Sequence, residues 1–293
     1  MKPQLKGSLL LFLATLIWGG SFVFQSVGMD YVGAYTFTGI RMVLGGLVLL
    51  PVIFFRDRAL KKRGEYQATD FGKLLLYGAI CGFFLCVGSV LQTNGLKYTT
   101  TAKSGFLTTF YIIFVALFSL LGKKKPTVHI WIGVFLALSG MYFLCLFGSD
   151  FSFNRGDLLT IACALFFTGQ IMGIDAFVHK VDPIKFSCAQ FLTAGILSLL
   201  LMFFFEQPNL GAITQCALPL LYTGILSCGV AFTLQVVGQQ YADPSSTTII
   251  MSFESVFASL AGWIFLSQGL TLPQLVGCAL IFIAVITVQF SKR

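Results

Sequence analysis

The chain has 293 residues, of which 57% are hydrophobic and only 10% are charged. A soluble globular domain carries about 25% charged residues, so this composition excludes an ordinary soluble domain and indicates a chain that lies in lipid. The net charge of +8 does not indicate nucleic-acid binding, because the basic residues lie in short segments between apolar runs and form no basic helix.

Ten apolar runs follow one another along the chain, each close to the ~20 residues that cross a bilayer. The expected spans are 7–27, 33–55, 72–94, 102–121, 128–147, 156–177, 184–205, 214–236, 245–267 and 272–290. The runs are continuous rather than alternating, which predicts helices and not the strands of a barrel. We therefore expect an all-α, multi-pass membrane protein with ten transmembrane helices.

The basic residues predict how these spans are oriented, because cytoplasmic loops of membrane proteins are rich in Lys and Arg. If the N-terminus is cytoplasmic, three cations lie outside: Lys97, Lys103 and Arg155. The inside segments then hold Lys2, Lys6, Arg56, Arg58, Lys61, Lys62, Arg63, Lys73, Lys123, Lys124, Lys125, Lys180, Lys185, Lys292 and Arg293. This excess predicts an inner-membrane protein with both termini in the cytoplasm.

An internal repeat organises the chain. A shift of 143 residues pairs Leu91-Gln92 with Leu234-Gln235, Gly95 with Gly238, Tyr98 with Tyr241, Phe110 with Phe253, and Phe114 with Phe257. A shift of 144 pairs Gly133 with Gly277, and a shift of 149 pairs Gly7 with Gly156, Gly20 with Gly169, and Arg41 with Gln190. The longer 56–71 loop accounts for the change of shift. We expect two five-helix halves, 1–148 and 149–293, and because five is odd the second half is inverted, as in many secondary transporters.

Three segments resemble a known family. Trp18-Gly19-Gly20-Ser21-Phe22 is similar to the first-helix motif of EamA-type members of the drug/metabolite transporter superfamily, and Gly39-Ile40-Arg41 to their second-helix segment. The stretch 252–258, with Gly262-Trp263 and 272–277, resembles their C-terminal signature, although Ser255 replaces a frequent proline and Ser267-Gln268 a frequent Gly-Glu. The resemblance implies ten helices and export of amino acids or other small metabolites through a central cavity between the halves.

Two ionisable residues inside predicted spans are the first candidates for function. Glu254 lies about 13 Å into its span, where a carboxylate is costly unless it is paired or protonated. It is interpreted as a proton site or a partner for a substrate ammonium group, or alternatively as an ion pair that locks helices together. Arg41 can bind a carboxylate bidentately, or it can pair with an acid such as Glu254 or with backbone carbonyls.

Neutral polar residues form a second set of candidates. Gln92 and Gln235 are repeat mates, as are Ser21 and Gln170, and such pairs around one axis predict an uncharged, hydrogen-bonding cavity. Interhelical hydrogen bonds are an equally good explanation. Tyr111 is the neutral mate of Glu254, so the pseudo-symmetry is broken where the charge lies.

Two further features are expected to shape the cavity. Trp18 is predicted to form an aromatic wall, and Gly19 and Gly20 a hinge, because paired glycines weaken a helix; a tight crossing with a neighbouring helix is the alternative. Ser252 lies on a hydroxyl-bearing face with Thr248, Ser255 and Ser259, which indicates close helix packing, and it is kept as a candidate substrate contact.

The function expected from these features is secondary transport of small metabolites, with protons as a candidate coupling ion. No cofactor or metal is expected, because the eight cysteines form no CxxC motif and there is no HExxH, GxSxG or Walker A sequence. The alternative is an intramembrane enzyme or a structural membrane subunit without transport activity. The sequence does not fix the substrate or the oligomeric state.

The orientation can be tested with single cysteines introduced at Lys61 and at Asn209 in a variant without the native cysteines. An impermeant thiol reagent added to intact cells should label the site at position 209 and not the site at 61, which should react only after the membrane is opened. Labelling of both sites from the same side would contradict the predicted topology.

Overall fold

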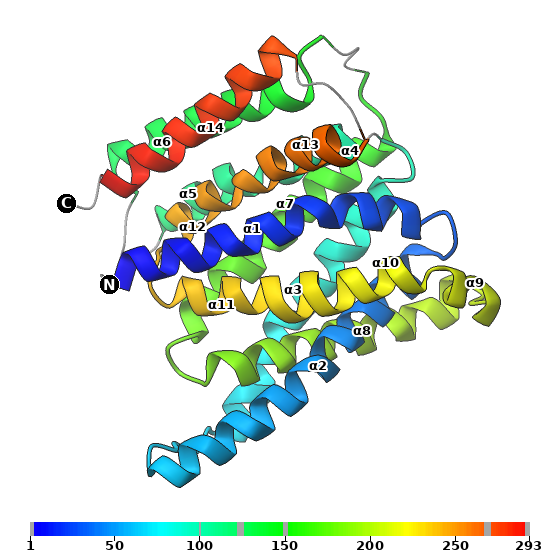
Figure 1. Ribbon diagram of the computed structural model, residues 1–293, viewed down its shortest axis with the longest axis vertical. Helices are drawn as coiled ribbons and strands as arrows, with labels where there is room; N and C mark the ends of the chain where they lie inside the picture. Colours follow the sequence, from blue (N-terminus) through cyan, green and yellow to red (C-terminus); the bar gives the residue numbers. More distant parts are fainter. Residues whose placement is uncertain (1–2, 100, 122–125, 149–151, 267–270, 291–293) are drawn as a thin grey trace.

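The computed structural model describes residues 3–99, 101–121, 126–148, 152–266 and 271–290, and every regular element in this part of the chain is helical. The Lys123–Lys125 run and Ser267-Gln268, both singled out in the sequence, lie outside the described residues. The helices run roughly along one common direction, and the start of α1 and the end of α14 lie at the same end of the bundle (Figure 1).

The first half of the chain contains six helical segments. They are α1 (Pro3–Gly28), α2 (Ala34–Arg63), α3 (Phe71–Gly95), α4 (Thr101–Thr108), α5 (Tyr111–Ser119) and α6 (Val128–Cys145). The second half contains α7 (Arg155–Phe177), α8 (Pro183–Phe205), α9 (Leu210–Gln215), α10 (Ala217–Leu221), the π-helix η1 (Tyr222–Phe232), α11 (Thr233–Gln239), α12 (Pro244–Met251), α13 (Phe253–Leu266) and α14 (Leu272–Phe290).

Seven helical stretches among the described residues are long and apolar enough to cross a bilayer. The expected spans 102–121 and 245–267 are each divided into two segments, α4 with α5 and α12 with α13, and the segment Leu272–Val288 is apolar but shorter. The structure therefore shows a multi-pass, all-helical membrane protein. The arrangement of ten spans in two inverted repeats agrees with it and stays a prediction.

Helix starts follow from local sequence. Asp182 and Asp243 each precede a proline, and their carboxylates accept backbone N–H groups in the first turns of α8 and α12. Asn154 and Asp157 form a capping box at the start of α7, in which each side chain accepts the other residue's backbone N–H. Caps of this kind satisfy N–H groups that the helix itself leaves unpaired.

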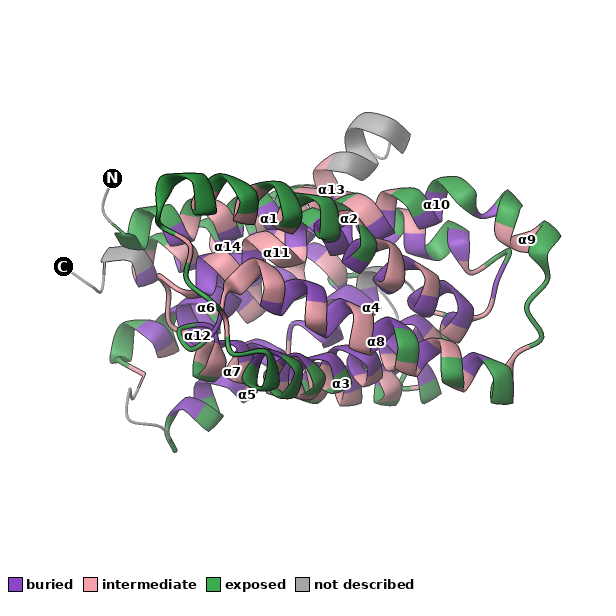
Figure 2. Cartoon of the chain, turned by 90° about the horizontal axis from the view of Figure 1, so that it is seen from below, coloured by how far each residue is buried: buried purple, intermediate pink, exposed green. Residues whose placement is uncertain are grey.

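The outer surface of the bundle is apolar. Large side chains such as Phe54, Phe135 and Phe204 are more than half exposed, and the exposed residues lie on the outside of the helices while the buried ones face inward (Figure 2). A soluble protein rarely exposes so much apolar surface. Lipid tails are the solvent that this surface fits.

Two close helix crossings are related by the repeat. A Cβ placed on Gly156 in α7 would lie 2.7 Å from the Gly95 carbonyl oxygen in α3. A Cβ on Gly7 in α1 would lie 2.9 Å from the Gly238 carbonyl oxygen in α11. The first pair maps onto the second under the sequence shifts, so both halves use glycine at the same place for close backbone approach.

Candidate functional site

Two of the expected spans are each divided into two helices, α4 with α5 and α12 with α13. The second helix of each pair carries one of the repeat mates Tyr111 and Glu254 in its first turn. The Thr109 hydroxyl donates to the Phe106 carbonyl, and the Ser252 hydroxyl donates to the Ile249 carbonyl, each at 2.6 Å. Thr109 and Ser252 are also repeat mates. Hydroxyl groups that bond back to the preceding turn bend helices, and Tyr111 and Glu254 follow these breaks directly.

A cavity that is partly open to the outside lies next to both breaks, and its empty space, including the space at its mouth, is about 550 Å³. Most of its lining consists of complete repeat-mate pairs. The seven pairs are Trp18 with Phe167, Ser21 with Gln170, Phe22 with Ile171, Ser89 with Phe232, Gln92 with Gln235, Thr108 with Met251, and Tyr111 with Glu254. The cavity therefore lies where the two halves face each other.

Three lining residues have no mate in the lining: Gln25 on α1, Arg41 on α2 and Ser227 on η1. The mate of Arg41, Gln190, is fully buried on α8 and accepts a hydrogen bond from Gln170 at 3.4 Å. These three residues, together with Glu254, give the cavity its chemical asymmetry.

The cavity collects most of the residues that the sequence singles out. Trp18, Ser21, Arg41, Gln92, Tyr111, Gln170, Gln235 and Glu254 all line it. Ser252 does not, because its hydroxyl is bonded to the backbone at the break and the residue is fully buried.

Gly19 and Gly20 lie at contacts between helices. A Cβ on Gly19 would lie 2.6 Å from the Phe257 Cβ, and one on Gly20 would lie 2.6 Å from the Tyr222 hydroxyl. Helix α1 runs unbroken through both residues. The tight-crossing interpretation fits this conformation, and the predicted hinge is not tested by it.

The two charged residues of the cavity have no counter-ion in the described part of the chain. Arg41 is 3% exposed, its guanidinium lies 5.6 Å from the centre of the Phe37 ring, and its Nε has no hydrogen-bond partner. Glu254 is half-buried and forms no ion pair among the described residues. The latch expected from pairing these two residues is thus not formed in this conformation.

Several neutral groups around the cavity are also unsatisfied. Four buried side-chain groups have no partner among the described residues: the Trp18 indole N–H, the hydroxyls of Ser89 and Tyr111, and the side-chain amide oxygen of Gln235. In contrast, Gln92 donates to Thr108 Oγ1 at 3.2 Å. Buried polar groups are normally hydrogen-bonded, and groups without a partner indicate a place for water or a ligand.

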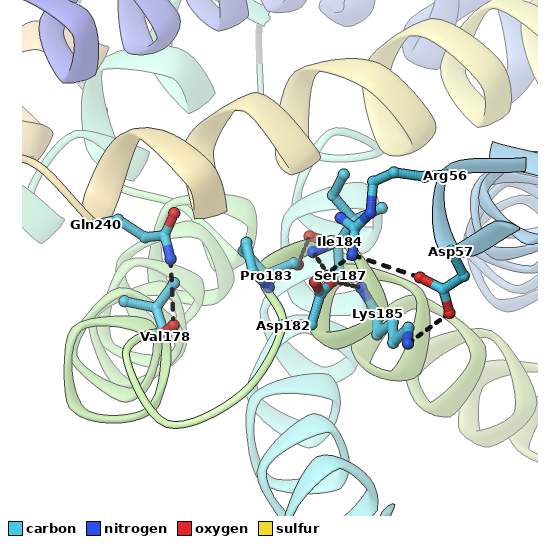
Figure 3. Close-up of polar contacts among 9 residues, drawn as sticks. All are labelled: Arg56, Asp57, Val178, Asp182, Pro183, Ile184, Lys185, Ser187 and Gln240. Atoms are coloured by element: carbon cyan, nitrogen blue, oxygen red, sulfur yellow. Dashed lines mark hydrogen bonds and ion pairs between the residues drawn. The ribbon is translucent and has the colours of Figure 1, made fainter. Parts of the chain in front are cut away.

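Several charged residues away from the cavity form ion pairs. Lys103 on α4 and Asp157 on α7 form a buried ion pair of 2.7 Å, and Thr99 also donates to Asp157. At the ends of α2 and α8, Arg56 bonds Asp182, and Lys185 lies 2.6 Å from Asp57 (Figure 3). These three ion pairs each join one half of the chain to the other.

The comparisons with known proteins agree with this architecture. The profile of the EamA-like transporter family matches residues 5–146 and again 154–290. The chain belongs to the EamA-like transporter family. A solved crystal structure superposes with a TM-score of 0.80 over 97% of this chain and 96% of the other, at 20% identity, which supports the fold alone.

Relatives of this EamA protein are named as transporters. An uncharacterized transporter of Archaeoglobus fulgidus is 32% identical over 98% of this chain and 86% of its own length. The uncharacterized transporter YoaV of Bacillus subtilis is 26% identical over 95% and 96%. The threonine/homoserine exporter RhtA of Escherichia coli is 28% identical over 94% and 88%.

Sequence reasoning missed part of the lining of this EamA cavity. Phe167 could have been found as the mate of Trp18, and Gln25 lies one helical turn after Ser21 on the same face. Ser227 had no such signal, because the π-helical turns of η1 change the face on which it lies.

Stability measurements can separate the paired charges from the unpaired ones. Asp157→Asn leaves Lys103 buried without its anion and should lower stability by about 3–5 kcal/mol. Glu254→Gln removes a charge that has no internal partner and should not lower the melting temperature of the purified protein. If Glu254→Gln destabilised the protein and Arg41→Gln restored it, Arg41 and Glu254 would form a latch in solution.

Proposed function

We propose that this protein is a secondary transporter that exports amino acids or closely related zwitterionic metabolites through the central cavity. The observation that carries the proposal is the presence of one buried cation and one partly buried anion in the same cavity, neither of them paired within the described residues. Arg41 binds the substrate carboxylate, and Glu254 binds its ammonium group.

The energetics favour a zwitterion over an ion of single charge. Charged side chains inside a membrane protein are costly, and their cost falls when an opposite charge is brought within hydrogen-bonding distance. A zwitterion neutralises Arg41 and Glu254 together and leaves the net charge of the cavity unchanged. Guanidinium–carboxylate pairs can also form two parallel hydrogen bonds, which fixes the orientation of the substrate.

Neutral groups complete the proposed site. The unpaired Tyr111 hydroxyl, Trp18 indole N–H and Gln235 carbonyl are available to the polar parts of a substrate. The aromatic faces of Trp18 and Phe232, whose ring centres are 4.7 Å apart, provide apolar surface beside them. A cavity with these contents suits small amphipathic molecules.

Alternating access supplies the transport step in this proposal. Inverted repeats with discontinuous helices at the binding site are typical of secondary transporters, in which one half moves relative to the other. The paired breaks at Thr109 and Ser252 are natural places for such movement. A proton gradient is one candidate energy source, with Glu254 as the proton carrier, and facilitated transport without coupling is the other.

The relatives support the direction and the substrate class. RhtA is named as an exporter of threonine and homoserine, and the transporter names of the other relatives favour transport over the alternatives of an intramembrane enzyme or a structural subunit.

Counterflow of labelled threonine into proteoliposomes tests the proposal. The native protein should exchange threonine, and Arg41→Gln and Glu254→Gln should each reduce exchange by about tenfold or more while staying folded, because each removes a charge-assisted hydrogen bond. Gln92→Leu and Gln235→Leu should also reduce it. Gln240→Leu, outside the cavity lining, is the matched control and should retain native exchange.

Competition distinguishes the two charged contacts. Threonine methyl ester lacks the carboxylate and N-acetylthreonine lacks the ammonium group, so neither should compete with labelled threonine. Native exchange in both charge variants, or full competition by both derivatives, would show that Arg41 and Glu254 do not bind a zwitterion.

A further inference from the structure

One side of the cavity carries a continuous chain of hydrogen bonds. The Gln25 amide donates to the Ser21 hydroxyl at 3.3 Å, and the Ser21 hydroxyl donates to the Ser227 hydroxyl at 3.1 Å. All three side chains are at least 95% buried and all three line the cavity. We call them the Ser21–Gln25–Ser227 cluster.

This chain of hydrogen bonds is incomplete at both ends. At one end the Gln25 carbonyl oxygen is buried and has no partner among the described residues. At the other end the Ser227 oxygen accepts from Ser21, and its own proton has no acceptor in the described part of the protein. The cluster therefore presents one free acceptor and one free donor, which is the complement of a hydroxyl group.

The cluster has no counterpart in the other half of the cavity. Gln25 and Ser227 are two of the three lining residues without a mate in the lining. Their mates under the repeat shifts, Ile174 and Phe84, are hydrocarbon side chains. Helix η1 is π-helical over 11 residues, and no π-helix occurs among the described residues of the first half. Turns of this kind occur frequently at functional sites.

We propose that the Ser21–Gln25–Ser227 cluster binds a hydroxyl group on the substrate side chain, so that the transporter selects hydroxylated amino acids over aliphatic ones of the same shape. This inference rests on the proposed function, because it assigns the side-chain subsite of the same cavity. A substrate hydroxyl accepts a hydrogen bond from Ser227 and donates one to Gln25. A methyl group in its place leaves both protein groups buried and unpaired, which strongly disfavours the analogue.

Threonine and valine provide the test, because they differ by one hydroxyl in place of one methyl group. In counterflow with purified protein in proteoliposomes, the native transporter should prefer threonine by about tenfold or more. Gln25→Leu and Ser227→Ala should lower threonine exchange and retain valine exchange, which brings the ratio towards one. Ser227→Thr keeps the hydroxyl and should keep the preference.

Gln170→Leu is the matched control in the other half of the cavity, because Gln170 is the mate of Ser21 and lies outside the cluster. It should change exchange of threonine and valine by the same factor and leave their ratio unchanged. Thermal stabilisation of each purified variant by threonine and by valine gives a second readout that does not depend on turnover.

The outcomes separate this inference from the proposed function. Equal exchange of threonine and valine by the native protein, or a native ratio retained in both Gln25→Leu and Ser227→Ala, would overturn the hydroxyl subsite while amino-acid transport stands. Absence of exchange and of stabilisation for both amino acids would overturn the proposed function and the subsite with it.

Discussion

The lack of water in the bilayer interior is the constraint on which this structure depends. A buried polar group that finds no partner within the protein is costly, because lipid tails provide none. Many hydroxyls find such a partner in their own helix: those of Thr93 and Thr168 each donate to a backbone carbonyl one turn earlier. The charged side chains of Lys103 and Asp157 pair with each other as a buried ion pair. Of the thirteen buried polar side-chain atoms that lack a partner in the described residues, six belong to residues of one cavity, and this concentration supports the proposal that the cavity binds a ligand.

The sequence repeat accounts for the position of the cavity, because most of its lining consists of repeat mates. The places where the two mates differ in chemistry give the cavity its asymmetry. The two halves share their crossing points, at Gly95 with Gly156 and at Gly7 with Gly238, and their mated side chains line one cavity. A fully symmetric cavity would have no means of orienting an asymmetric substrate. The differences between mates, such as Glu254 in place of Tyr111 and Arg41 without a charged mate, give the cavity one acidic and one basic side chain, which in the proposed function bind the ammonium group and the carboxylate.

Much of this arrangement could be predicted from the sequence, because it depends on hydropathy and on spacing. Continuous apolar runs predict the helices, and the repeat shifts predict that Gln92 and Gln235 share one cavity, which both residues line in the structure. The breaks in α4–α5 and α12–α13 could not be predicted, since the hydroxyls of Thr109 and Ser252 can bond either to a ligand or to their own backbone. The sequence accordingly predicts Ser252 as a substrate contact, whereas in the structure it is fully buried and is not part of the cavity lining. The position of Ser227 depends on a π-helix, for which hydropathy gives no signal.

A structure of the protein with an amino acid bound would test the zwitterion site most directly. The binding scheme predicts the carboxylate within hydrogen-bonding distance of the Arg41 guanidinium and the ammonium group within hydrogen-bonding distance of the Glu254 carboxylate. A bound amino acid that contacts neither residue, or a liganded structure in which Arg41 and Glu254 pair with each other, would contradict it.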